Sequence, residues 1–144
     1  MNVYVAASFT DVARVREVHA ELERMGLRYV STWVRHADGS RERLEAMTDE
    51  ARAAIIEEND SAVRRADVLI VLAGLEGKET FAEARFAAEL GTLILWVGEP
   101  RPLTAYRRNV QRFADVELAL AFLSGLAGRK PSVARRWGLP RVGV

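Results

Sequence analysis

The chain has 144 residues, of which 49% are hydrophobic and 28% charged, a balance typical of one globular domain with a sizeable core. It contains no cysteine, which excludes disulfides, thiolate metal sites and cysteine nucleophiles. Its longest apolar run, residues 68–75, is too short to span a bilayer, so we expect a cytoplasmic protein with no membrane partner.

The net charge of +1 is unevenly distributed along the chain. All 20 acidic residues precede residue 118, whereas residues 127–144 contain five arginines and lysines and no acid. We therefore expect a single α/β domain over residues 1–126 and a basic carboxyl-terminal extension over 127–144. A basic extension could bind nucleic acid, but its Gly, Pro and Ser content favours a solvated or partner-docked segment, so nucleic acid is an unlikely partner.

The first half of the chain alternates between strand and helix patterns. Residues 2–7 predict a buried strand, and residues 11–25 have apolar positions at helical spacing, with Gly26 as a cap. A second strand is predicted over 27–33 and a polar loop over 36–47. A helix over 48–65 follows.

The second half continues this alternation. Residues 67–72 form a run that is apolar on both faces, which indicates a strand buried in a parallel sheet. A helix over 80–90, a strand over 92–97, a short strand over 110–113 and a helix over 115–126 complete the series. This order predicts a three-layer α/β/α sandwich with a five-stranded parallel sheet in the flavodoxin- or Rossmann-like order 2-1-3-4-5.

In such a sheet the chain changes direction between strands one and three, and ligands bind at the carboxyl ends of the strands at this point. Residues 6–9, the loop 73–79 and the helix start at 80–83 should meet there. Phe9 and Trp33 could stack on a base or pack against neighbouring loops. The predicted substrate-binding residues in these segments are Ala6, Ser8, Phe9, Trp33, Gly77 and Thr80.

Glu83 is the first candidate catalytic residue. It shares an apolar stripe with Phe86, Ala87 and Leu90, and the start of a helix would keep its carboxylate ionised and able to act as a nucleophile. The alternative is structural, because Thr80-x-x-Glu83 also matches a capping box in which the glutamate bonds only the helix terminus.

Asp60 and Tyr4 are the other two catalytic candidates. Asp60 borders the apolar face of its helix and could donate a proton, or it could simply pair with Arg64 one turn later. The Tyr4 phenol could hydrogen-bond a carboxylate, or it could be an ordinary buried aromatic. Two carboxylates beside one crevice are the usual equipment for breaking a bond at an anomeric carbon.

Several other chemistries lack their sequence motifs. The chain has no phosphate-binding P-loop, no G-x-G-x-x-G after the first strand and no G-x-S-x-G elbow. The positions of His19 and His36 indicate neither a metal site nor a catalytic triad. We expect no metal and no cofactor.

With these residues placed, the sequence resembles the nucleoside 2-deoxyribosyltransferase-like family over about residues 1 to 123. In place of the family's usual Glu-x-Gly-x-Ala, this chain has Glu83-Ala-Arg85-Phe-Ala87, with Lys78-Glu79 before Thr80. The matching pieces are residues 3–9, residues 31–33, Asn59-Asp60 with 65–71, Thr80-Phe-Ala-Glu83 with Ala87 and Gly91, and Glu99-Pro-Arg through Asn109-Val to Phe113.

The resemblance implies an enzyme that cleaves or exchanges the N-glycosidic bond of a nucleoside or nucleotide with retention at C1′. Glu83 would attack C1′, Asp60 would assist at the base, Tyr4 would steady the nucleophile and Asn109 would contact substrate. It also implies a homodimer or higher homo-oligomer in which a neighbour's carboxyl-terminal segment helps to close the site.

Two alternatives belong to other classes of protein. One is a non-catalytic module that binds a nucleotide or sugar phosphate at Lys78 and the helix start. The other is a nucleic-acid accessory protein that works through the basic extension.

Overall fold

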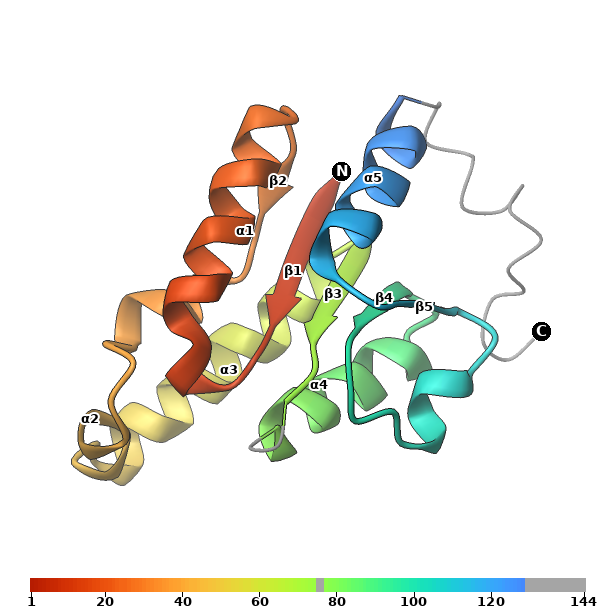
Figure 1. The fold of residues 1–144 in the computed structure, drawn as a ribbon. Helices are drawn as coiled ribbons and strands as arrows, with labels where there is room; N and C mark the ends of the chain where they lie inside the picture. Colours follow the sequence, from red (N-terminus) through yellow and green to blue (C-terminus); the bar gives the residue numbers. More distant parts are fainter. Residues whose placement is uncertain (75–76, 129–144) are drawn as a thin grey trace.

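The fold is built around a five-stranded parallel sheet in the order β2-β1-β3-β4-β5 (Figure 1). A computed structural model describes residues 1–74 and 77–128. The predicted fold class and strand order are confirmed. The strands are β1 (Asn2–Ala6), β2 (Arg28–Tyr29), β3 (Val68–Leu72), β4 (Leu93–Val97) and β5 (Val110–Phe113).

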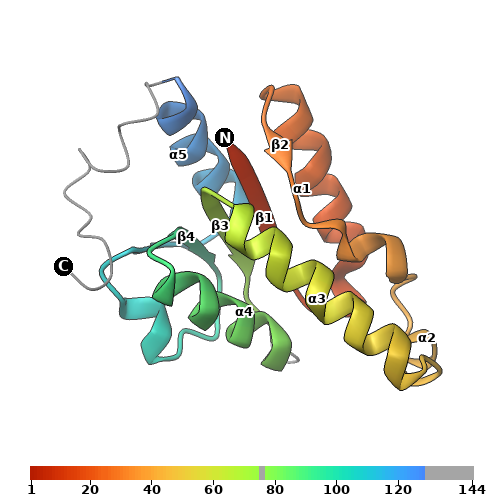
Figure 2. The ribbon, with the colours of Figure 1, turned by 180° about the vertical axis from the view of Figure 1, so that it is seen from behind.

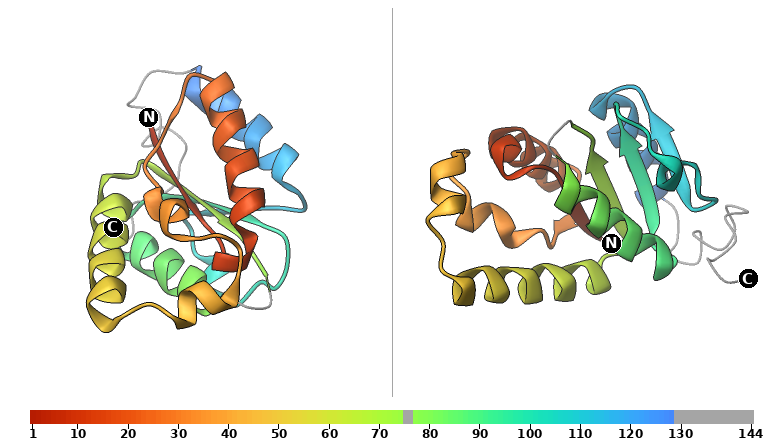
Figure 3. Two further views of the ribbon diagram at one scale, coloured as in Figure 1. Left: turned by 90° about the vertical axis from the view of Figure 1, so that its left-hand side faces the viewer. Right: turned by 90° about the horizontal axis from the view of Figure 1, so that it is seen from below.

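Helices cover both faces of the sheet, which makes three layers. Figure 3 shows α1 (Val12–Arg24) and α5 (Val116–Ala127) on one face, with α3 (Asp49–Arg65) and α4 (Lys78–Glu89) on the other. In the reverse view of Figure 2, α3 and α4 lie in front of the strands. The short helix α2 (Arg41–Glu45) precedes α3, and the 3-10 turns η1 (Phe9–Asp11), η2 (Thr32–His36) and η3 (Leu103–Tyr106) follow β1, β2 and β4.

The core lies between the layers. Every residue of β3 and β4 is buried, as expected for central parallel strands covered on both faces. Tyr4, Trp33 and Trp96 are the largest fully buried side chains. Among residues 1–74 and 77–128, no helix has the length and apolar character needed to cross a membrane.

The segment after β1 and α1 differs most from the sequence-based prediction. We expected a strand over 27–33, but β2 has only two residues, both exposed at the sheet edge. The Ser31 hydroxyl accepts a hydrogen bond from the Val5 amide at 3.0 Å, so a side chain takes the place that the ladder would occupy. The predicted loop 36–47 contains α2, whose first turn is capped by Ser40.

Two features of the helix after β3 also differ from the prediction. We expected the helix after β3 to begin at Thr80, but α4 begins at Lys78. Leu90, predicted to lie on the apolar stripe of this helix, is instead 47% exposed. Of the expected basic extension, only residues 127 and 128 lie within the described part of the chain.

Candidate active site

The segments that follow β1 and β3 meet at the carboxyl edge of the sheet. A Cβ atom placed on Gly74, after β3, would lie 3.9 Å from Oδ2 of Asp11 in η1. The sheet order brings these segments together because β1 and β3 are neighbours, with Ala6 paired to Val71. This is the edge at which the topology predicts a ligand site.

Gly77 fixes the start of α4 at this edge. Its carbonyl accepts the amide hydrogen bond of Phe81 at 2.8 Å, which closes the first turn. A Cβ at Gly77 would come within 3.1 Å of the Gly74 carbonyl oxygen and 3.4 Å of the Phe81 ring, so the chain packs tightly here. Phe81 in turn stacks on Trp96 of β4 at 5.3 Å, which anchors α4 to the sheet.

Because α4 starts at Lys78, Glu83 lies in its second turn. Thr80 and Glu83 do not form a capping box, because the residue before the helix is Gly77, and no side chain among the described residues caps the amides of the first turn. Glu83 therefore does not serve its own helix terminus. Thr80 is buried within the helix, and its Oγ1 has no hydrogen-bond partner among the described residues.

The Glu83 carboxyl group is largely removed from water. Its Oε2 is buried without a hydrogen-bond partner in the described part of the chain, although the residue as a whole is only half-buried. Burial raises the pKa of Glu83 to about 7; the Tyr4 hydroxyl lowers this pKa, and the charges of Glu79 and Asp60 raise it. At neutral pH the group is thus divided between its acid and its carboxylate.

After burial, the Tyr4 hydroxyl has the largest effect on the pKa of Glu83. Burial, followed by the charge of Glu83, raises the pKa of the Tyr4 phenol far above its usual range, so it remains a hydrogen-bond donor. Within residues 1–74 and 77–128, Tyr4 Oη and Glu83 Oε2 meet no partner in hydrogen-bond geometry. The two groups nevertheless lie close enough for the neutral Tyr4 hydroxyl to lower the pKa of Glu83 as a donor, and each has capacity left for a ligand.

Asp60 is half-buried on α3, which packs beside α4. Its charge acts on both Tyr4 and Glu83. The ion pair with Arg64 that the sequence allowed is not found among the described residues. Arg64 instead lies over the ring of Phe86, 5.3 Å from its centre. The structure therefore brings together the three predicted catalytic residues: Tyr4 from β1, Asp60 from α3 and Glu83 from α4.

The two predicted base-stacking residues, Phe9 after β1 and Trp33 after β2, pack against each other. Trp33 is only 2% exposed and donates from Nε1 to the Val5 carbonyl at 2.9 Å, so it belongs to the core. Phe9 is half-buried and packs on Trp33 with ring centres 5.4 Å apart. Of these two residues, Phe9 is the one with surface left for a ligand. Ser8 caps η1 through Thr10, and Ala6 is fully buried.

Asn109 does not join this group. It precedes β5, and its carbonyl accepts from the Ile94 amide near the start of β4, so it lies at the amino edge of the sheet. Its side-chain amide donates to the Thr92 carbonyl at 2.7 Å and supports the turn between α4 and β4. The placement of Asn109 at the substrate, taken from the resemblance, is corrected by the sheet register.

Two acids that were not among the predicted site residues act on the site. The charge of Glu79 acts on Glu83, and the i, i+4 spacing of the two residues could have indicated this. The charge of Glu58 acts on Tyr4, and its carboxylate accepts hydrogen bonds from Thr32 and, at 3.0 Å, from His36 Nε2. No sequence motif links these three residues, because their contact depends on how η2 docks on α3.

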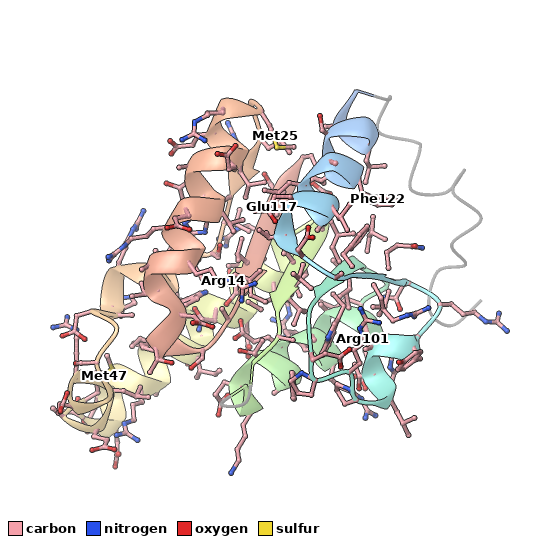
Figure 4. All side chains as sticks on the ribbon, in the orientation of Figure 1. Arg14, Met25, Met47, Arg101, Glu117 and Phe122 are labelled. Atoms are coloured by element: carbon pink, nitrogen blue, oxygen red, sulfur yellow. The ribbon has the colours of Figure 1, made fainter. Side chains whose placement is uncertain are left out.

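Two cavities lie on other parts of the surface. One of about 730 Å³ lies between α2 and α3, where Figure 4 marks Met47, and Glu58 forms part of its wall. The other, of about 300 Å³, is lined by α1 and the segment after β2, including His19 and Ser31. No cluster of three potential metal ligands occurs among residues 1–74 and 77–128.

Comparisons with known proteins identify the fold. No protein-family model matches the sequence, and a search of curated proteins gives no significant match. Among solved structures, a 2-deoxyribosyltransferase from the psychrotolerant bacterium Bacillus psychrosaccharolyticus superimposes with a TM-score of 0.68 at 14% identity, over 93% of this chain and 96% of the other. A CMP N-glycosidase from Clostridium botulinum superimposes with a TM-score of 0.54 at 16% identity, over 78% and 88%. The chain therefore has the fold of a 2-deoxyribosyltransferase and of a CMP N-glycosidase.

Proposed function

We propose that this protein is a nucleoside 2-deoxyribosyltransferase-like enzyme that cleaves or transfers the N-glycosidic bond of a nucleoside or nucleotide. One observation carries the proposal: Glu83 presents a partly desolvated carboxyl group, unused by its own helix, beside Tyr4 and Asp60. The shared fold with two enzymes named for nucleoside and nucleotide chemistry supports it.

The reaction follows from the charge state of Glu83. Its carboxylate attacks C1′, a C–O bond forms, and the C1′–N bond breaks with its electron pair leaving on the base. Asp60 supports the departing base, either by supplying a proton or by holding the base in place. Water or a second base then attacks C1′ and frees Glu83, so two inversions give net retention.

Tyr4 serves the nucleophile as a neutral donor. Its pKa is raised, so it cannot add a negative charge to the site, and its hydroxyl favours the ionised form of Glu83. Because the pKa of Glu83 is about 7, we expect base release to increase as the pH rises through neutrality. A rate that falls over the same range would contradict a carboxylate nucleophile.

A panel of ribo- and deoxyribonucleosides and their 5′-monophosphates, incubated with and without an acceptor base, tests the proposal. Chromatography should show free base, or a new nucleoside when the acceptor is present. Glu83→Gln should lower the rate by at least about 10⁴-fold while the circular dichroism spectrum stays unchanged. Equal activity of wild type and Glu83→Gln would refute the mechanism.

A binding module is the second candidate, and one feature favours it. Lys78 begins the first turn of α4. Among the described residues, no side chain caps this turn, and Thr80 Oγ1 has no partner. Free amides at a helix start suit a phosphate. Thermal stabilisation by nucleotides with no base released after long incubation would select this alternative.

We further propose that the enzyme is a cytoplasmic homo-oligomer that needs neither metal nor cofactor. Sedimentation analysis of the full chain tests the assembly, with a monomer at micromolar concentration as the contradicting result. Activity that survives dialysis against a chelator would support independence from metal.

A further inference from the structure

We propose that Glu79 sets the charge selectivity of this site and disfavours substrates that carry a phosphate group. The inference rests on the proposed function, because it concerns which nucleoside or nucleotide reaches Glu83. It gives a specific role to a residue at which the chain departs from the family pattern that it otherwise resembles.

The first support is the position of Glu79 on α4. Glu79 and Glu83 are four residues apart, so they lie on the same side of the helix, with Cβ atoms about 5–6 Å apart. Glu79 is exposed in the first turn, whereas Glu83 is half-buried in the second. Glu79 thus lies in solvent one helix turn before the residue whose carboxyl group is proposed to react.

The second support is that the neighbouring cations are directed elsewhere or already paired. Lys78 is five residues before Glu83, which places it about 140° around the helix axis. Arg85 pairs with Glu89 at 3.3 Å, and Arg64 lies over the ring of Phe86. Within the described part of the chain, Glu79 has no ion-pair partner, so its charge remains available to act on a substrate.

The third support is the sign of the remaining groups. Asp60 approaches from α3 and the neutral phenol of Tyr4 from β1, so none of the described side chains that act on the pKa of Glu83 is positively charged. A phosphate group carries a charge of about −1.5 to −2 at pH 7. A 5′-phosphate is attached to the same sugar whose C1′ meets Glu83, so it falls within about one Debye length of these acids.

The test compares kcat/KM for deoxyadenosine and deoxycytidine with kcat/KM for their 5′-monophosphates. We expect the wild type to favour the nucleosides and this preference to shrink as salt is added. Glu79→Lys should raise the nucleotide-to-nucleoside ratio on the order of tenfold, and Glu79→Gln should raise it less. Glu79→Gln should also move the midpoint of the pH–rate profile downward, because a like charge is removed from beside Glu83.

Glu117 provides a matched control. It is exposed at the second position of α5, as Glu79 is at the second position of α4, but Figure 4 shows it on the helix layer that covers the other face of the sheet. Glu117→Lys and Glu117→Gln make the same changes in net charge and at a helix start. They should leave the ratio and the pH midpoint unaltered.

An equal ratio in Glu79→Lys and Glu117→Lys would overturn the inference while leaving the proposed function intact. Failure of the wild type to release base from any substrate would instead count against the proposed function. In that case calorimetric titration with the same nucleosides and monophosphates decides the role of Glu79. Tighter binding of nucleosides than of monophosphates, with a difference that Glu79→Lys reduces, would support the proposed role of Glu79. Equal affinities for nucleosides and monophosphates would refute this role.

Discussion

At the level of single residues, the site is marked by polar atoms left without partners. Tyr4 Oη and Glu83 Oε2 are both buried, and the described residues give neither a hydrogen bond. A buried polar group without a partner costs about 1–3 kcal/mol of folding free energy. A bound ligand that hydrogen-bonds to both groups would offset this cost.

Tyr4→Phe separates this functional role from a structural one. Because the hydroxyl is unpaired and the ring fills the same space, we expect the variant to be as stable as the wild type or more stable by about 1 kcal/mol. The rate of base release should fall, and its pH midpoint should move upward, because the hydroxyl lowers the pKa of Glu83. Urea denaturation and pH–rate profiles measure both effects.

Tyr106→Phe is the control for this substitution, since Tyr106 is 57% exposed on η3, next to Arg112. It should change neither stability nor rate. A large loss of stability in Tyr4→Phe would show that the Tyr4 hydroxyl is satisfied in solution and serves the fold.

At the level of elements, one carboxylate joins η2 to α3. The Glu58 carboxylate accepts hydrogen bonds from Thr32 and His36. Both hydrogen bonds lower the pKa of Glu58, and the one from Thr32 has the larger effect. A lowered pKa contributes stability above the ordinary pKa of a glutamate, and this contribution is lost as the pH falls through the lowered value. We expect Glu58→Ala to cost about 1 kcal/mol at pH 7, because the pair is partly exposed, and less at pH 3.

Urea denaturation at the two pH values tests this, and hydrogen exchange should become faster in residues 32–36. Glu57→Ala, one residue away and exposed, should have little effect at either pH. An equal cost for Glu58→Ala at pH 7 and pH 3 would show that its charge does not hold η2.

The elements also show how far the sequence could be interpreted. Strands β3 and β4 could be predicted because their unbroken apolar runs specify strands buried on both faces. The end of β2 could not be predicted from the sequence. The Ser31 hydroxyl takes the place of a backbone hydrogen bond to β1 only once α1 and β1 are packed. The start of α4 was placed too late because Thr80 resembles a cap, whereas the close approach of Gly77 to Gly74 decides the boundary.

At the level of the whole molecule, the sheet order determines which predicted residues meet. Tyr4, Asp60 and Glu83 could be assigned to one group because alternating strands and helices restrict the topology to a few choices. Asn109 could not be placed from a motif alone, because its position depends on where β5 begins and on how β5 pairs with β4. The effects of Glu58 and Glu79 on the site depend on helix docking, which local patterns do not contain.

A site of this kind should weaken the whole fold at the pH where it works. The folded protein holds Glu83 at a pKa of about 7, against an ordinary value of 4.5, so between these values the folded state binds more protons than the unfolded state. The contribution of Glu83 to the free energy of unfolding therefore declines as the pH rises from 4.5 to 7. Glu83→Gln lacks this titration, so it should be more stable than the wild type by as much as about 3 kcal/mol at pH 8.

Near pH 4 this advantage should vanish, because Glu83 is protonated in both the folded and the unfolded state. Urea denaturation of the wild type and Glu83→Gln at pH 4 and pH 8 measures the difference, with exposed Glu57→Gln as the control for a change in net charge. An advantage that is the same at both values would mean that the Glu83 carboxylate is well solvated. If Glu83→Gln is more stable than the wild type only at high pH and no longer releases base, the buried Glu83 carboxylate lowers the stability of the fold and is needed for the reaction.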